Sequence, residues 1–287
     1  MWFAPASALL AQEPRVSRDV ECPSCADWSV PQRPFSIFGN AYYVGTHGLS
    51  ALLLTSEAGH VLIDGALPES APAIMSSIRA LGFRVEDVKV ILNSHAHYDH
   101  AGGIAELQRA SGARIAASPW SASVITHGQS AQDDPQYGVL LPYPAAATVS
   151  TISDGDTVRV GDLAVTAHFT PGHTPGGTTW TWRSCERTRC LDIVYADSQS
   201  PISSPSYLYS ASPAALSNFE HSYAVLEHVR CDILVTPHPG ASEFFARIVA
   251  RDSGGVPAIV DTEACRRFAA KAREALAQRL ARERSGK

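Results

Sequence analysis

Residues 91–103 read Ile91-Leu92-Asn93-Ser94-His95-Ala96-His97-Tyr98-Asp99-His100-Ala101-Gly102-Gly103, and they continue an apolar run that begins at Val88. Three histidines and one aspartate, all metal-binding residue types, occur within six positions of this stretch. If the chain is still extended where it leaves the predicted strand, His95, His97 and Asp99 project to one side and His100 to the other. One short segment could then supply ligands to two metal ions.

The surroundings of this cluster favour a site over a packed core. Gly102 and Gly103 permit a tight turn and a close backbone approach before the next helix. The cluster follows the carboxyl end of a strand, which is where α/β proteins place ligands. Neutral imidazoles are costly to crowd unless a cation organises them, so a chance grouping is a poor explanation. Imidazole and carboxylate without thiolate favour zinc, although iron, manganese and cobalt accept the same ligands.

Composition limits the kinds of partner. The chain has 287 residues, of which 45% are hydrophobic and 18% charged, and its formal net charge is −5. A chain of this length can bury a substantial core in one large domain or two small ones. The acidic balance gives no sign of a polyanionic partner, so we expect no nucleic-acid binding. No apolar run is long enough to span a bilayer, so we expect no membrane segment.

The N-terminus has a short apolar stretch followed by small residues, like the end of a secretory signal peptide that lacks its basic start. We predict that residues 1–18 are a signal-peptide remnant or a disordered N-terminus, and that residues 19–287 form one domain.

The cysteines lie away from the histidine cluster, at Cys22, Cys25, Cys185, Cys190, Cys231 and Cys265. An even number outside a metal motif favours disulfides and an oxidising compartment. Cys185 and Cys190 flank a polar turn that a bridge could close, and a long-loop bridge between Cys231 and Cys265 is plausible. Cys22 and Cys25 form a lone C-x-x-C, which is either a local disulfide or two spare thiols.

The order of predicted elements indicates an α/β fold. Helical spacing of apolar residues predicts helices over 72–81, 103–110 and 213–229, with two more at the C-terminus. Strand-like runs fall at 41–44, 52–55, 61–64, 88–92, 113–117, 151–160, 163–169, 178–182, 192–196 and 232–235. Residues 127–147 show no periodicity and predict a long surface loop. Two successive sets of strands and helices suggest two halves packed sheet on sheet, with helices outside.

Four motifs resemble those of the metallo-β-lactamase superfamily. They are His-Ala-His-Tyr-Asp-His at 95–100, Pro-Gly-His-Thr-Pro-Gly-Gly at 171–177, Tyr-Ala-Asp-Ser-Gln-Ser at 195–200 and Thr-Pro-His-Pro-Gly at 236–240. The chain is most similar to the third subclass of class B β-lactamases, the di-zinc group without a cysteine ligand, and the pairs Cys185/Cys190 and Cys231/Cys265 also resemble that subclass. The resemblance implies an αβ/βα four-layer sandwich, with two mixed β-sheets packed face to face and helices outside.

The resemblance also implies a ligand set and a reaction. His95, His97 and His173 would hold one zinc ion, and Asp99, His100 and His238 a second. A zinc-bound hydroxide oriented by Asp99 would open the β-lactam ring of penicillins, cephalosporins or carbapenems, with no covalent enzyme intermediate. The expected partner is a small-molecule β-lactam, and we expect a monomer that is periplasmic or secreted.

Ser198 and Ser200 resemble the substrate-binding hydroxyls of the subclass, while Gln199 stands where an apolar residue is expected. The same scaffold serves thioester and lactone hydrolases, in which an aspartate of the third motif bridges both metals, and Asp197 is the candidate here. Adjacent residues of an extended segment project to opposite sides, so we expect Ser198 to face the metals and Asp197 to point away. A non-catalytic metal-binding protein is the remaining alternative, and the intact ligand set argues against it. Trp28, the 127–147 loop and Tyr207 are candidate walls of the groove.

Overall fold

Strand β5 (Val88–Leu92) forms where the apolar run predicts it and lies inside a seven-stranded sheet. The computed structural model describes residues 22–286, so the prediction for residues 1–18 lies outside the described part. The strands of this first sheet follow one another in sequence order: β1 (Phe35–Phe38), β2 (Ala41–Tyr43), β3 (Leu52–Ser56), β4 (Gly59–Ile63), β5, β6 (Arg114–Ala117) and β7 (Val149–Thr151). Strands β2 to β4, which match the predicted runs 41–44, 52–55 and 61–64, pair antiparallel. Strand β1, which was not predicted, adds a further antiparallel strand, and β4 to β7 pair parallel.

The second sheet has five strands in the order β12-β11-β10-β9-β8. Its strands are β8 (Thr157–Val160), β9 (Leu163–Phe169), β10 (Thr178–Glu186), β11 (Arg189–Tyr195) and β12 (Ile233–Val235). Only β11 and β12 pair parallel, so both sheets are mixed. The helices are α1 (Cys25–Trp28), α2 (Ala71–Ala80), α3 (Tyr98–Ala101), α4 (Ile104–Ser111), α5 (Pro119–His127), α6 (Pro213–His228), α7 (Phe244–Gly254) and α8 (Ala264–Ser285).

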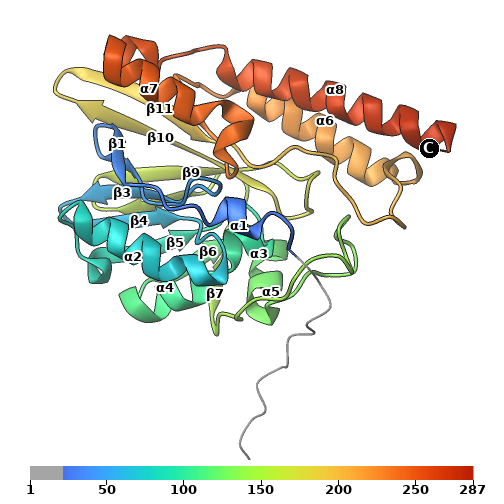
Figure 1. Cartoon of the computed structure of the whole chain (residues 1–287), viewed down its shortest axis with the longest axis horizontal. Coiled ribbons are helices and arrows are strands. Elements are labelled where there is room, and N and C mark those ends of the chain that lie inside the picture. Colours follow the sequence, from blue (N-terminus) through green and yellow to red (C-terminus); the bar gives the residue numbers. More distant parts are fainter. Residues whose placement is uncertain (1–21, 287) are drawn as a thin grey trace, which may run out of the picture.

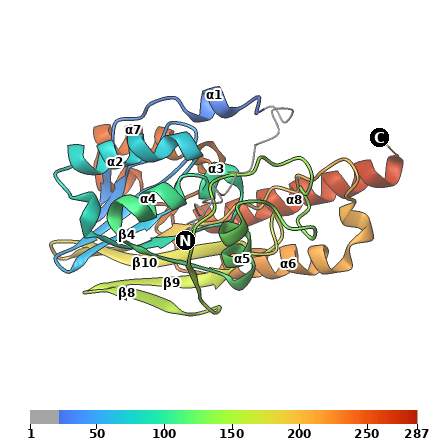
Figure 2. The ribbon, with the colours of Figure 1, turned by 90° about the horizontal axis from the view of Figure 1, so that it is seen from below.

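Period-two alternation in the strands sorts side chains into three apolar cores. Leu52 and Leu54 of β3 face the second sheet, where they join Trp180, whereas Leu53 between them faces helices α2 and α4. A third core lies between the second sheet and helices α6 and α8. Figure 1 shows the resulting layers, with α2 and α4 on one side of the sheets and α6 and α8 on the other, and Figure 2 gives the view from below, along the direction in which the layers are stacked. The predicted four-layer sandwich is confirmed.

Two local predictions were wrong or incomplete. The run 151–160 is not one strand, because Thr151 ends β7 in the first sheet and β8 begins at Thr157 in the second. Helix α5 was not predicted, although Ser118 caps it by accepting a hydrogen bond from the Ser121 amide and Pro119 occupies its first turn. Both features lie where the chain passes from one half to the other.

All six cysteines are paired in disulfides. Cys185–Cys190 joins directly opposite residues of the β10–β11 hairpin, and Cys231–Cys265 connects the residues before β12 to helix α8. Cys22–Cys25 is a disulfide as well, so the first of the two alternatives for that pair holds. Among residues 22–286, no helix combines the length and the apolar character needed to cross a bilayer.

Candidate metal centre

The histidine motif leaves β5 in an extended conformation only as far as His97. That residue has φ −79° and ψ 156°, and helix α3 begins at Tyr98. Asp99 and His100 therefore lie on a helical turn, and the predicted alternation of His95, His97 and Asp99 on one side is wrong for Asp99. Just after this helix, Gly103 allows a close packing of the backbone: a Cβ atom on it would lie 2.3 Å from the carbonyl oxygen of Gly65.

Asp64, which sequence reasoning assigned to a strand, anchors the start of the motif. Its carboxylate is fully buried and accepts hydrogen bonds from the Ser94 amide (2.7 Å), the Ser94 hydroxyl (2.6 Å) and the Tyr195 hydroxyl (2.8 Å). The residue has φ 63°, a left-handed conformation that is rare outside glycine. Strained residues cluster at functional sites, and here Asp64 ties β4, the motif and β11 together.

His95, His97 and His173, which the resemblance assigns to one zinc ion, lie together in the structure and are called the first ligand group. All three are buried, and one nitrogen of each lies within 4.8 Å of the others. His173 comes from the loop between β9 and β10, so the group joins both halves of the fold.

Each of these histidines has one ring nitrogen toward the other two ligands, and the N–H of its second ring nitrogen donates a hydrogen bond to an oxygen atom of the protein. His95 Nδ1 donates to Asp197 Oδ1 at 2.7 Å, His97 Nε2 to Asp134 Oδ2 at 3.0 Å, and His173 Nδ1 to the Ser200 carbonyl oxygen at 2.8 Å. These bonds fix the tautomers and leave His95 Nε2, His97 Nδ1 and His173 Nε2 without a proton. The Gln136 side-chain amide lies 3.4 Å from His173 Nε2 and can donate to it. His95 Nε2 is buried and has no hydrogen-bond partner among the described residues, as expected of a metal ligand.

Asp197 is fully buried and lies behind His95, on the Nδ1 side of the ring and not between the two ligand groups. The chain can turn it inward because Gly177 leaves room: a Cβ atom there would lie 2.4 Å from Asp197 Oδ2.

Asp134 was missed, because it lies in the 127–147 loop, which has no periodicity. It is 1% exposed, and the loop around it is bound to both halves. The Tyr143 hydroxyl donates to the Ala96 carbonyl oxygen at 2.8 Å, and the Ser204 amide donates to the Pro135 carbonyl oxygen at 2.8 Å. The predicted surface loop is therefore partly an interior segment that reaches the metal ligands.

Asp99, His100 and His238 form the second group. Asp99 Oδ2 lies 3.2 Å from the Nε2 atoms of both His100 and His238, and these two nitrogens are 3.2 Å apart. His95, Asp99 and His100 also offer ligand atoms within 4.8 Å of one another, so the two groups adjoin. The His238 side chain is 34% exposed and forms the open side of the centre.

Burial controls the protonation of the ligands. Burial, together with the neighbouring histidines, holds the pKa of His95 well below its ordinary value and lowers the pKa of His173 to about 3. Burial alone would raise the pKa of Asp99, but His100 and His238 hold it well below its usual range. His95 and His173 thus present neutral imidazoles and Asp99 a carboxylate at neutral pH, which are the forms that bind metal.

The donor set fits zinc. It consists of imidazole nitrogens and a carboxylate oxygen without thiolate, converging from two halves of the fold with their tautomers fixed.

Ser198 and Ser200 follow β11 and are partly exposed beside His238, where the three residues line one cavity. Gln199 between them is 2% exposed, and its amide donates to the Thr170 carbonyl oxygen at 3.3 Å, so it supports the loop. The Trp28 ring lies 5.2 Å from that of His238 and does form a wall of the centre. Tyr207 instead packs against Tyr209.

Comparisons with known proteins agree with this geometry. A family profile described as the metallo-beta-lactamase superfamily matches residues 44–228. Among solved structures, the Rm3 metallo-beta-lactamase is 52% identical with a TM-score of 0.90, over 92% of this chain and 99% of that one. MEM-A1, a subclass B3 metallo-beta-lactamase from a soil metagenome library, is 48% identical with a TM-score of 0.89, over 91% of this chain and 100% of that one.

Curated sequences show a more distant similarity. A hydroxyacylglutathione hydrolase of Bradyrhizobium sp. is 34% identical over 45% of this chain and 41% of its own length. The matched part of the chain thus spans about two fifths of such relatives. The solved structures confirm the resemblance to the third subclass, and the extent of the family match shows that the chain belongs to the metallo-β-lactamase superfamily.

Proposed function

We propose that the protein is a hydrolase that opens the β-lactam ring of antibiotics with two zinc ions per chain. The observation that carries the proposal is the pair of adjoining ligand groups, His95/His97/His173 and Asp99/His100/His238, beside two partly exposed serines. When bound, zinc lowers the pKa of a water molecule and polarises a carbonyl group.

The protein's own groups have separate tasks in this reaction. Asp99 is a carboxylate at neutral pH that belongs to the second ligand group and lies beside His95 of the first. It can accept a hydrogen bond from the attacking water and so orient it. The hydroxyls of Ser198 and Ser200 can donate hydrogen bonds to the carboxylate that a β-lactam carries beside its ring. Trp28 packs against His238, and Gln136 of the 127–147 loop lies 3.4 Å from His173, so both segments lie beside the proposed metal ligands.

Thioester hydrolysis is the second candidate, because the curated relatives include hydroxyacylglutathione hydrolases. That reading, like the lactonase reading, needs Asp197 between the metals. Asp197 Oδ1 instead accepts a hydrogen bond from the Nδ1 atom of His95, on the opposite edge of the ring from the free Nε2, which favours the lactamase reading.

A side-by-side hydrolysis assay distinguishes these functions. The zinc-loaded protein should hydrolyse a penicillin, a cephalosporin or a carbapenem with a far higher kcat/KM than an acylglutathione thioester or an acylhomoserine lactone. Faster hydrolysis of the thioester or lactone would overturn the proposal.

Three disulfides are consistent with a periplasmic or secreted location, which we propose for this protein. We also propose that it is a monomer.

A further inference from the structure

A cavity of about 250 Å³ extends from the candidate metal centre to the C-terminal helix α8. Ser198, Ser200 and His238 line it on one side, and Phe268, Lys271 and Ala275 of α8 line it on the other. The cavity is continuous with the place proposed for the substrate, because one of its walls is a metal ligand.

Lys271 is the one residue with a fixed positive charge among the described residues that line this cavity. Its neighbours on α8 have partners: Arg267 pairs with Asp261, and Arg273 pairs with Glu220 and Glu227. Within residues 22–286, no carboxylate lies within 4 Å of the Lys271 ammonium group. Its charge is thus not neutralised by an ion pair.

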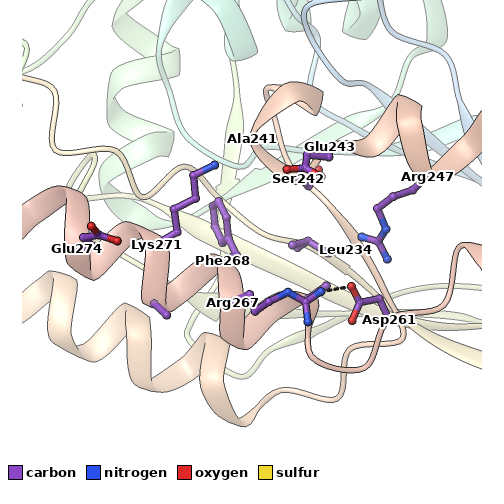
Figure 3. Close-up of a pocket in the computed structure, with 12 residues that line it drawn as sticks. Leu234, Ala241, Ser242, Glu243, Arg247, Asp261, Arg267, Phe268, Lys271 and Glu274 are labelled. Atoms are coloured by element: carbon purple, nitrogen blue, oxygen red, sulfur yellow. Dashed lines mark hydrogen bonds and ion pairs between the residues drawn. The ribbon is translucent and has the colours of Figure 1, made fainter.

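Figure 3 shows how these side chains are arranged in the adjoining cavity, which has a volume of about 460 Å³ and shares Phe268 and Lys271 with the first. Arg267 turns toward Asp261, whereas Lys271 extends from α8 alongside the ring of Phe268. Lys271 therefore lies between the two cavities and can present its ammonium group to the one that contains His238.

We propose that Lys271 is a specificity-determining residue that binds the carboxylate of the substrate. The inference rests on the proposed function and adds to it. Ser198 and Ser200 offer only neutral donors, and the rest of the cavity wall includes the apolar Ala241, Phe268 and Ala275. Lys271 is exposed, so solvent weakens its attraction to charge, but as the one fixed cation on this wall it still favours an anionic substituent over a neutral one.

This contact should affect KM more than kcat. The carboxylate is not a reacting group, so its attraction to Lys271 is equally strong in the ground state and the transition state, which is uniform binding. An ion pair at an exposed site changes binding by up to about fivefold. Lys271→Ala should therefore raise KM by up to about fivefold for a carboxylate-bearing β-lactam, while Lys271→Arg keeps KM near the wild-type value.

A cycle of two substrates and two proteins isolates the contact. KM is measured for a penicillin and for its methyl ester with the wild type and with Lys271→Ala. The two substrates differ only in the carboxylate, so any effect of Lys271→Ala on the rest of the site changes both KM values equally. The expected result is a rise in KM for the free carboxylate and almost none for the ester. Arg266→Ala is the control, because Arg266 is an exposed cation of the same helix that pairs with Glu263.

Three results would overturn the inference: an unchanged KM for the carboxylate in Lys271→Ala, an equal rise for the ester, or an equal rise in Arg266→Ala. If the zinc-loaded wild type hydrolyses no β-lactam at all, the proposed function itself fails. The two failures are therefore distinguishable.

Discussion

Asp134 is a positioning residue, since it holds His97 from a loop that has no regular structure. Its carboxylate accepts the Nε2–H of His97 at 3.0 Å and leaves Nδ1 for the metal. Asp134→Ala should weaken zinc binding about 10- to 100-fold, which is the usual effect of removing such a partner. Competition with a chromophoric chelator measures this affinity.

The matched control for Asp134 is its neighbour Asp133, whose carboxylate accepts a hydrogen bond from Trp120 at the surface. Asp133→Ala removes the same charge and should leave zinc affinity unchanged. Equal zinc affinities in wild type and Asp134→Ala would show that the hydrogen bond does not position His97.

Ser198 and Ser200 are the proposed donors to the substrate carboxylate. Replacing both with Ala should raise KM for penicillins or carbapenems about tenfold, because two hydrogen bonds to a charged group are lost. The zinc content should not change, because His173 Nδ1 loses only the Ser200 hydroxyl at 3.2 Å and keeps its hydrogen bond to the Ser200 carbonyl oxygen at 2.8 Å. Ser253→Ala, an exposed hydroxyl on α7, is the control, and loss of zinc from the double variant would contradict the assignment.

The candidate ligand residues could be predicted from sequence because each carries a local signal. Four of them form one cluster at 95–100 directly after a strand, while His173 follows Gly172 and His238 lies between two prolines. Asp134 and Asp64 could not be predicted in this way. Asp134 lies 37 residues from His97 within a segment without periodicity, and Asp64 is one residue beyond a strand whose apolar pattern hides its end. Their roles depend on contacts that only the folded chain makes.

At the scale of elements, the disulfides differ in the length of chain that they close. Cys231–Cys265 spans 34 residues and ties helix α8 to the segment before β12, whereas Cys185–Cys190 spans five and closes a hairpin. Loop-closure entropy predicts that removing the long bridge lowers the free energy of unfolding by about 3–4 kcal/mol, and that removing the short one lowers it by about 2 kcal/mol. Urea unfolding of the Cys231→Ala/Cys265→Ala and Cys185→Ala/Cys190→Ala variants measures both losses, and a larger loss for the short bridge would refute the entropic account.

Helix α8 is also attached near its C-terminus through Glu283. This side chain is 4% exposed and accepts hydrogen bonds from the amides of Tyr209 and Ser210 and from Arg279. Burial alone would raise its pKa, but the donors lower it from 4.5 to about 2. A depressed carboxyl pKa stabilises the folded state above the unfolded value of 4.5, and this stabilisation is lost as the pH falls through about 2.

Glu283→Gln should therefore lower the free energy of unfolding at pH 7, and the difference from wild type should shrink as the pH falls below 4.5. Urea titrations at a series of pH values test this trend. Glu274→Gln, an exposed carboxylate on the same helix, should show no such difference. A gap between Glu283→Gln and wild type that stays constant down to pH 3 would contradict the prediction.

The long amphipathic elements were predictable, whereas the connections were not. Helix α2 and strand β5 are continuous periodic runs, so their residues specify a buried face. Helices α3 and α5 are short and depend on their ends: α3 begins where the backbone turns after His97, and α5 depends on the cap at Ser118. Strand β7 has no buried side chain and forms through its pairing with β6.

At the scale of the whole molecule, the candidate site forms only when the two halves of the fold pack together, because each half supplies part of it. His95 and His97 come from the first sheet, while His173, Ser198 and His238 follow strands of the second. The Trp180 indole donates to the Asn93 carbonyl oxygen at 3.0 Å, and Tyr195 donates to Asp64, so buried hydrogen bonds hold the sheets in register beside the ligands. The order of motifs predicted this meeting, but the distances depend on packing.

A zinc titration of the metal-free protein tests the central claim most directly. The initial rate of carbapenem hydrolysis is measured as zinc is added, and the bound zinc is determined by elemental analysis at each point. We expect no hydrolysis without metal and a rate that rises to a plateau at two zinc ions per chain. A protein that binds two zinc ions and leaves the carbapenem intact, or one that hydrolyses it equally well after zinc is removed, would contradict the account.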